Sequence, residues 1–146
     1  MLDSSHNLLL SEEEATRRLR ASDILPTLQR IQIAQVLLTH DQHLSADQVM
    51  EQAYEAGSRV SKATVYNTLG LFARKGVIRE VIVDPTRVFY DTNVTPHHHF
   101  YNIDTGELTD IDADQLTLQK LPALPKGTAA AGVDVIVRLR EVSSDS

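Results

Sequence analysis

Three consecutive histidines, at positions 97, 98 and 99, are the residues of this chain whose types and spacing point most directly to chemistry. The residues around them are typical of a β-strand, in which successive side chains face opposite sides. His97 and His99 should therefore share one face, while His98 faces the other. Two imidazoles on one face are suited to binding Zn²⁺, Fe²⁺ or Mn²⁺. The alternative is a solvated polar stretch that binds no metal.

Three other residues could add donors to this pair, namely His43, Asp91 and Asp110. The combined set draws on two expected lobes of the chain, so a bound ion would fix the angle between them. We expect one divalent metal per subunit, Fe²⁺ or Mn²⁺ in the cell, with Zn²⁺ as the alternative in the purified protein because it is higher in the Irving–Williams order. Each carboxylate, taken alone, could equally be solvated or cap a helix.

A second group of polar residues lies in a stretch with a helical pattern, residues 61–75. Thr64 and Tyr66 can contact thymine methyl groups and phosphates, and Asn67 can hydrogen-bond the edge of an adenine. Lys62 is placed for a phosphate contact. The alternative is an amphipathic surface helix with a buried tyrosine. The neighbouring elements favour the first interpretation.

Four helices are expected in the first part of the chain, because a serine or threonine that can cap a helix precedes each helical pattern. These residues are Ser11, Thr27, Ser45 and Ser61. A loop is expected at residues 41–43, and two β-rich runs around an Asp-Pro turn, 77–83 and 87–90, predict a hairpin. Helices followed by a hairpin are typical of a winged helix-turn-helix domain, in which the helix before the wing enters the major groove.

The pattern changes after the hairpin. The expected elements are strands at 97–103, 107–111 and 132–142, and a short helix at 112–121. This part has too few apolar residues for an independent core, so pairing with a second copy would bury its sheet. We therefore predict an α+β protein, with an N-terminal winged helix-turn-helix domain (residues 1–90) and a small α/β dimerisation domain (residues 91–146).

Composition narrows the classes of protein. The chain has 146 residues, a net charge of −6 and no cysteine, which excludes disulfides, thiolate metal sites and thiol nucleophiles. The acidic total disfavours a protein that coats nucleic acid indiscriminately, but residues 59–87 carry a local charge of +4 that is compatible with site-specific DNA binding. The chain has neither an apolar run of membrane-spanning length nor the pattern of a signal peptide, so we expect a cytoplasmic protein without a membrane partner.

Several motifs resemble the ferric uptake regulator family over nearly the whole chain, from about Thr27 to Glu141. They are residues 27–30 (TLQR), residues 43–47 (HLSAD), and residues 63–66 (ATVY) with Leu69 and Gly76. The resemblance implies a winged-helix lobe followed by a dimerisation lobe, with metal binding that controls repression. It therefore implies a homodimer that binds a palindromic operator in double-stranded DNA, with Arg30 among its DNA-binding residues, and not an enzyme.

The same resemblance implies that the metal ligands are His43, Asp91, His97, His99 and Asp110. Aspartates at the carboxylate positions are similar to those of peroxide-sensing members. The first cysteine pair of the family's structural zinc site falls on Asn102 and Thr105, so no structural cysteine zinc is expected. The basic residue that members of the family often place before Thr27, where it contacts the minor groove, is Leu25 here, so no such contact is expected from this position.

The run 97–101 (HHHFY) and the ending 133–140 (VDVIVRLR) resemble the iron response regulator subfamily. In that subfamily the histidine triplet is implicated in haem sensing. His97, His98 and His99 are therefore candidate haem ligands. The Cys-Pro haem motif that some members carry is missing, so a haem role would depend on these histidines alone.

Three functions are compatible with these observations. The first is a metal-responsive DNA-binding transcriptional regulator of iron homeostasis, with haem as a further candidate signal. The second is a peroxide-sensing repressor in which bound iron catalyses oxidation of a ligand histidine. The third is a small metallohydrolase that uses the His/Asp site, although five protein donors would leave little open coordination for a substrate.

Overall fold

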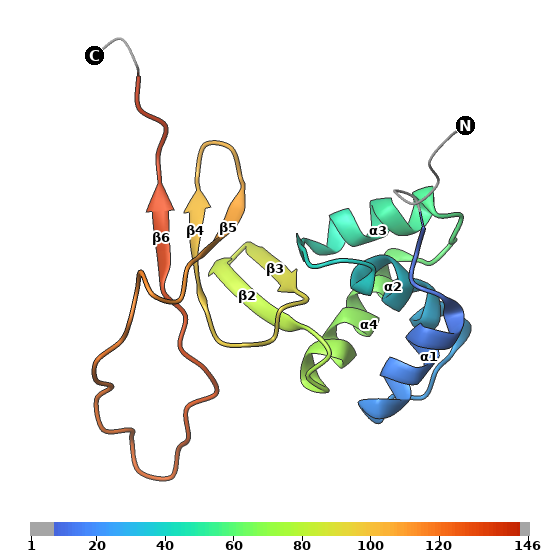
Figure 1. The fold of residues 1–146 in the computed structure, drawn as a ribbon, viewed down its shortest axis with the longest axis horizontal. Coiled ribbons are helices and arrows are strands. Elements are labelled where there is room, and N and C mark those ends of the chain that lie inside the picture. Colours follow the sequence, from blue (N-terminus) through green and yellow to red (C-terminus); the bar gives the residue numbers. More distant parts are fainter. Residues whose placement is uncertain (1–7, 144–146) are drawn as a thin grey trace. The chain divides into compact units, whose positions relative to one another are not determined.

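The structure is a computed structural model that describes residues 8–143. The chain divides into two compact units between Val94 and Thr95 (Figure 1). Asp91, with which the second domain was expected to begin, ends the last strand of the first unit. The helices precede a hairpin and the remaining strands follow, which confirms the α+β class.

All four helices of the first unit begin where the capping residues predict. They are α1 (Glu12–Ala21), α2 (Leu28–Leu38), α3 (Ala46–Glu55) and α4 (Lys62–Arg74). At each start, the side-chain oxygen of the preceding serine or threonine accepts a hydrogen bond from the backbone N–H three residues later. This bond satisfies an amide that would have no partner within the helix. Gly76 follows α4 with a φ of 78°, a conformation that glycine adopts without steric cost.

The predicted hairpin is present as β2 (Arg79–Asp84) and β3 (Arg87–Asp91), which pair antiparallel. Asp84 closes the turn, because its Oδ1 accepts hydrogen bonds of 2.8 Å from the backbone N–H and from the hydroxyl of Thr86. These two hydrogen bonds hold the pKa of the Asp84 carboxyl below its usual value.

A short strand, β1 (His43–Leu44), replaces part of the loop expected at residues 41–43. It pairs antiparallel with β3 and completes a three-stranded sheet in the order β1-β3-β2. Backbone and side-chain bonds between Gln42 and Thr92 hold its start: Thr92 N–H donates to Gln42 O (3.2 Å), and Gln42 N–H donates to Thr92 Oγ1 (3.1 Å). The prediction of a loop was wrong at His43, because the strand there forms by pairing with Asp91, which is distant in sequence and gives no local signal.

The core of the first unit is formed by apolar side chains of all four helices together with Leu44 and Tyr90 of the sheet. Val65, Leu69 and Phe72 are buried on one face of α4. That face anchors the helix in the core, because the three side chains recur at helical spacing. The opposite face of α4 is consequently left toward solvent.

The second unit has one three-stranded sheet in the order β5-β4-β6. Its strands are β4 (His98–Asn102), β5 (Leu108–Ile111) and β6 (Ile136–Leu139). β4 pairs antiparallel with β5 and parallel with β6. The predicted strands are present, but the last one covers only part of the expected range 132–142.

The helix predicted at residues 112–121 is absent, and residues 95–143 contain no helix. A turn forms instead, closed by a bond of 2.9 Å from Gln115 N–H to Asp112 O. Leu118 and Leu121, which would have formed the apolar stripe of such a helix, are 46% and 48% exposed. A helix of this length depends on packing of its apolar stripe, and that packing is missing here.

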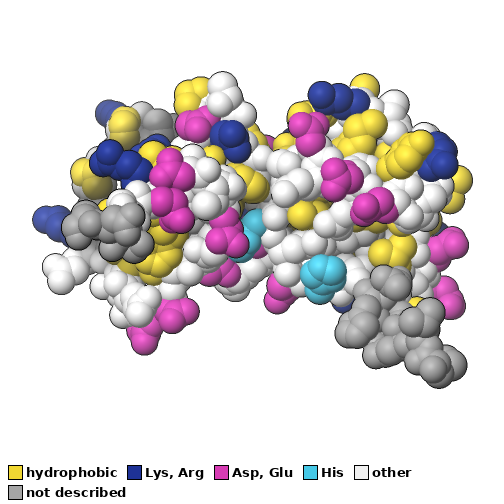
Figure 2. Space-filling view, turned by 90° about the horizontal axis from the view of Figure 1, so that it is seen from above, with side chains coloured by type: hydrophobic (Ala, Val, Ile, Leu, Met, Phe, Trp, Pro, Cys, Tyr) yellow, Lys and Arg dark blue, Asp and Glu magenta, His cyan; other side chains and the backbone are white. Residues whose placement is uncertain are grey.

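No helix within residues 8–143 is long and apolar enough to span a bilayer. On the face drawn in Figure 2, acidic and basic side chains lie interspersed among hydrophobic ones. Charge of both signs is thus spread over this face of the protein.

Candidate functional site

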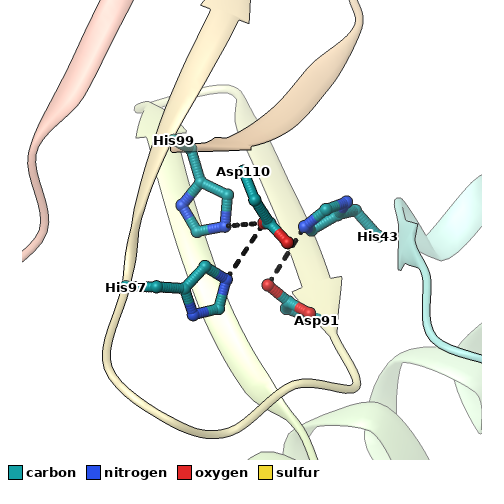
Figure 3. A group of neighbouring side chains, drawn as sticks. All are labelled: His43, Asp91, His97, His99 and Asp110. Atoms are coloured by element: carbon teal, nitrogen blue, oxygen red, sulfur yellow. Dashed lines mark ion pairs between the residues drawn. The ribbon is translucent and has the colours of Figure 1, made fainter. Parts of the chain in front are cut away.

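His43 and Asp91 form the part of the candidate metal centre that belongs to the first unit. The register of β1 with β3 places the two residues directly opposite each other. His43 Nε2 lies 3.1 Å from Asp91 Oδ2, and Asp91 Oδ1 accepts a bond of 2.9 Å from the backbone N–H of Asn93. Asp91 is only 2% exposed, so its charge requires such partners. The pair is drawn in Figure 3.

His97, His99 and Asp110 form the part that belongs to the second unit. The register of β4 with β5 places His99 opposite Asp110. His99 Nε2 lies 3.3 Å and His97 Nε2 lies 3.1 Å from the same carboxylate oxygen, Asp110 Oδ1. The two rings are tilted against each other with centroids 4.4 Å apart (Figure 3). The two imidazoles and the carboxylate thus converge on one point.

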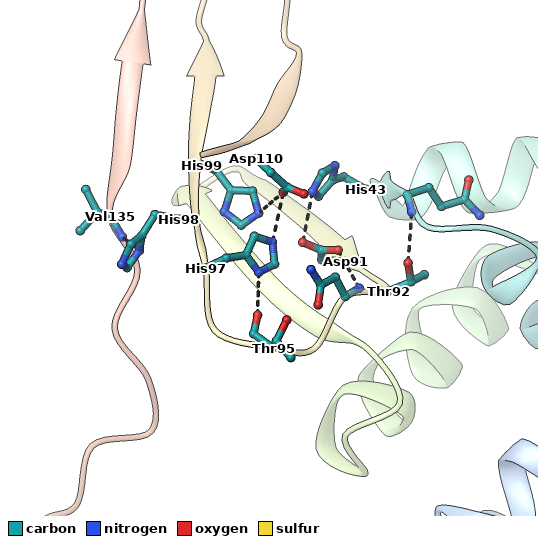
Figure 4. Close-up of polar contacts among 11 residues, drawn as sticks. His43, Asp91, Thr92, Thr95, His97, His98, His99, Asp110 and Val135 are labelled. Atoms are coloured by element: carbon teal, nitrogen blue, oxygen red, sulfur yellow. Dashed lines mark hydrogen bonds and ion pairs between the residues drawn. The ribbon is translucent and has the colours of Figure 1, made fainter. Parts of the chain in front are cut away.

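The hydrogen bonding of His97 decides what this point can hold. Its Nδ1 lies 2.6 Å from the carbonyl oxygen of Thr95, and a carbonyl can only accept, so Nδ1 carries the hydrogen (Figure 4). In a neutral ring Nε2 then has a lone pair that faces Asp110 Oδ1. Such a contact requires positive charge, either a proton on the ring or a metal ion. A carbonyl that fixes Nδ1–H is also the usual support of a histidine that binds metal through Nε2. The donor set therefore fits a divalent cation.

His98 takes part in a different contact, as the alternation of side chains along a strand predicts. Its Nδ1 accepts a hydrogen bond of 2.9 Å from the backbone N–H of Val135, while the N–H of His99 donates to Val135 O at 3.2 Å (Figure 4). Val135 directly precedes β6. His98 consequently fixes β6 beside β4 and does not contribute to the Asp110 cluster.

The predicted DNA-binding residues of α4 lie toward solvent, on the side away from the core. Lys62 and Asn67 are exposed, and Tyr66 is 46% exposed, so the alternative of a buried tyrosine is wrong. Lys62 Nζ lies 5.9 Å from the Tyr66 ring centroid and 3.9 Å from Asp47 Oδ1. The backbone N–H and the hydroxyl oxygen of Thr64 both bond to Ser61 Oγ at the helix cap.

Arg30, on α2, lies beside this surface. Its Nη1 donates to the carbonyl oxygen of Leu25 at 2.9 Å, and its side chain lines a surface pocket together with Tyr66 and Asn67. Arg74 lines the same pocket, although no sequence motif had singled it out. The signal that could have found Arg74 is its position seven residues after Asn67, a spacing that places the two residues on the same face of α4.

Comparison with known proteins identifies relatives of this chain. A model of the ferric uptake regulator family matches residues 22–135. The peroxide-responsive repressor PerR of Staphylococcus aureus is 29% identical over 104 residues, which cover 71% of this chain and 70% of that protein. These matches span both units.

Solved structures give the same result. The ferric uptake regulator of Pseudomonas aeruginosa with manganese is 28% identical and superposes with a TM-score of 0.68, over 88% of this chain and 98% of that chain. The ferric uptake regulator of Vibrio cholerae is 18% identical with a TM-score of 0.66, over 86% and 98% of the two chains, and so supports the fold.

Members of the matched family are DNA-binding transcription regulators and not enzymes. This confirms the expectation that the chain is not an enzyme and removes the metallohydrolase alternative. The family model covers well over half of the chain. This protein therefore belongs to the ferric uptake regulator family of metal-responsive transcription regulators.

Proposed function

We propose that this protein is a homodimeric transcriptional regulator of iron homeostasis that binds a palindromic operator when one divalent ion per subunit sets its conformation. The observation that carries the proposal is the convergence of His97 Nε2 and His99 Nε2 on one oxygen of Asp110, in a chain of a metal-responsive family. Two imidazole nitrogens and a carboxylate are a common ligand set for Fe²⁺, Mn²⁺ and Zn²⁺.

The metal site proposed here combines both units. His97, His99 and Asp110 supply three donors, which is fewer than the six that Fe²⁺ or Mn²⁺ commonly takes. His43 and Asp91 are a second pair of the same chemical types, and they come from the unit that carries α4. An ion held by all five residues would restrict the orientation of one unit against the other and thereby select the form that can span two half-sites.

Fe²⁺ or Mn²⁺ is the proposed physiological ion. The relative from Pseudomonas aeruginosa was solved with manganese, and the donors of this chain are nitrogen and oxygen atoms only, without thiolate. Zn²⁺ binds such a set more tightly, so the supply of metal in the cell decides between these ions.

The homodimer is proposed from the second unit. Its outer strand β6 leaves Val137 and Leu139 each 37% exposed, and the preceding segment exposes Leu118, Leu121 and Leu124. Apolar side chains concentrated in so small a unit favour burial against a second copy. Sedimentation velocity should give a dimer for the natural chain and a larger fraction of monomer for Leu139→Lys.

Metal and DNA binding can be tested together. Isothermal titration of the metal-free protein with Mn²⁺ should give one site per subunit, which His99→Ala and Asp110→Ala should each abolish or weaken at least tenfold. His40→Ala is the matched control, since His40 is exposed and outside the proposed site. Mobility-shift assays with the protein's own promoter region should then differ between metal-free and metal-loaded protein. Equal DNA binding by both forms would refute metal control.

Peroxide sensing is a second candidate function. The aspartates at positions 91 and 110 and the identity of 29% with the PerR repressor both favour it. Iron-loaded protein treated with H₂O₂ should gain one oxygen atom on a ligand histidine, detected by mass spectrometry of peptides. His40 serves as the internal control. Unmodified His43, His97 and His99 under these conditions would exclude this mechanism.

Haem binding through His98 would conflict with its hydrogen bond. Because Nδ1 accepts from Val135 N–H, the neutral ring carries its hydrogen on Nε2, and Nε2 could bind iron only after loss or transfer of that proton. We therefore propose a divalent metal, and not haem bound through His98, as the ligand of this protein. Titration with haemin, followed by the Soret band, tests this proposal: His98→Ala should leave the spectrum of any bound haem unchanged.

A further inference from the structure

Two arginines line one surface pocket beside α4, Arg74 from α4 itself and Arg30 from α2. The pocket has a volume of about 360 Å³. Its lining residues are Arg30, Tyr66, Asn67, Thr68, Gly70, Leu71 and Arg74. The lining includes two guanidinium groups and neither aspartate nor glutamate, although the chain as a whole has a net charge of −6. The pocket is therefore a locally cationic place on an acidic protein.

Gly70 explains how Arg74 reaches this pocket. Side chains of a helix lean toward its N-terminus, so the guanidinium of Arg74 extends back over the position four residues earlier. A Cβ atom built at Gly70 would lie 3.4 Å from Arg74 Nη1, at the lower end of ordinary contact. A Cβ atom at residue 70 would therefore contact the guanidinium, and a side chain longer than that of alanine would displace it.

Neither Arg30 nor Arg74 forms an ion pair with a carboxylate of residues 8–143. Lys75, the next residue after Arg74, lies 3.6 Å from a carboxylate oxygen of Asp23. Arg30 is also held in place, because its Nη1 donates to the carbonyl oxygen of Leu25. Two guanidinium groups that have no carboxylate partner within residues 8–143 are suited to an oxyanion such as phosphate.

We propose that this pocket binds one phosphate group of the DNA backbone and that Arg74 is a DNA-contacting residue. The inference rests on the proposed function, in which α4 enters the major groove. Tyr66 and Asn67, the candidates for base contacts, line the same pocket, so a backbone phosphate next to the contacted base would lie within reach of both arginines. The same chemistry would also accept free phosphate, and the experiment distinguishes the two sources.

The test is fluorescence anisotropy with the metal-loaded protein and a duplex selected by this protein from random sequences. Arg74→Ala should weaken binding roughly tenfold and reduce the slope of log K against log salt by about 0.9 for each pocket in contact. Lys75→Ala is the matched control, because it removes the same charge one residue away and outside the pocket. Equal effects of the two variants would overturn the proposal.

Gly70→Leu tests the geometry without removing a charge. Leucine favours helix more than glycine does, so thermal stability should be maintained or raised, while the displaced guanidinium should weaken DNA binding several-fold. Unchanged DNA binding by a folded Gly70→Leu variant would overturn the proposed placement of Arg74.

A third measurement separates DNA phosphate from free phosphate. Inorganic phosphate, followed by chemical shifts of the Gly70 and Arg74 amides, should cause no saturable change at millimolar concentration. Saturation together with unaltered DNA binding by Arg74→Ala would assign the pocket to a free anion and overturn the proposal. Failure of the natural protein to bind any duplex, with or without metal, would instead contradict the proposed function itself.

Discussion

The two units of this chain position their metal-ligand candidates by different means. In the first unit, His43 and Asp91 are strand partners attached to a core that fully buries Leu37, Leu69 and Phe72. In the second, His99 and Asp110 lie in one sheet and His97 directly precedes its strand β4; the buried apolar residues of this sheet, within 95–143, are Tyr101, Leu108 and Ile111. The first pair is therefore fixed by the folding of its own unit. For the second group, which has fewer buried apolar residues around it, we expect order to depend more on the proposed metal ion and the proposed partner subunit.

This difference has a consequence for regulation. A unit with a complete core changes little when an ion binds, whereas a thin sheet can be ordered by the ion it holds. Signal sensing is thus expected to alter the second unit most, while DNA recognition stays on the rigid first unit. Variants at three places in the chain test this difference between the two units.

The largest effect should come from the core of the first unit. Phe72→Ala removes a fully buried ring and should lower the free energy of unfolding by about 3–5 kcal/mol, measured by urea denaturation of the metal-free protein. Leu108→Ala, in the second unit, should cost less because the sheet around it can relax. A cost of Leu108→Ala equal to that of Phe72→Ala would show that the second unit also has a tightly packed core.

The next effect compares the two carboxylates. Asp91 is 2% exposed and bonded to the backbone of Asn93, so Asp91→Ala should destabilise metal-free protein by about 1–3 kcal/mol. Asp110 is 48% exposed, and Asp110→Ala should cost under about 1 kcal/mol in the same denaturation experiment. Both variants should bind metal more weakly. Asp110→Ala should thus lose metal affinity with little loss of stability, whereas Asp91→Ala should lose both. Equal destabilisation by the two variants would contradict the contrast between the units.

Local sequence signals predicted most of the first unit. Four capping residues gave the helix starts, and the Asp-Pro turn gave the hairpin, because these features depend on neighbours within a few residues. The strand at His43 was missed because its partner Asp91 is distant in sequence. The helix predicted at 112–121 is absent because a helix of this length depends on packing against other elements, which no local pattern encodes.

In the candidate site, too, local patterns predicted some features, and contacts between distant segments could not be predicted. Alternation along a strand predicted that His97 and His99 face together, and both contact Asp110 Oδ1. The role of His98 at Val135 could not be predicted, because β6 pairs with β4 through a parallel crossover that no local pattern encodes. Arg74 was missed for a related reason: the pocket that it lines is completed by Arg30, which comes from another helix.

The most local expected effect concerns His98 and the edge of the second sheet. His98→Ala removes the acceptor of the Val135 N–H bond and should lower the free energy of unfolding by about 1 kcal/mol. Hydrogen exchange of the Val135 amide should accelerate, while amides of α4 in the first unit keep their rates. This result would show that the loss of stability is local to the sheet of the second unit.

His98→Asn is the informative companion variant, because the side-chain oxygen of asparagine can take the place of Nδ1 as an acceptor. It should restore slow exchange at Val135 although the imidazole is gone. Restoration would establish that His98 acts as a hydrogen-bond acceptor that joins β6 to the strand carrying the ligand His99. Slow exchange at Val135 in His98→Ala would mean that the backbone bond from His99 to Val135 holds this edge by itself, and that the second unit is more rigid than its burial indicates.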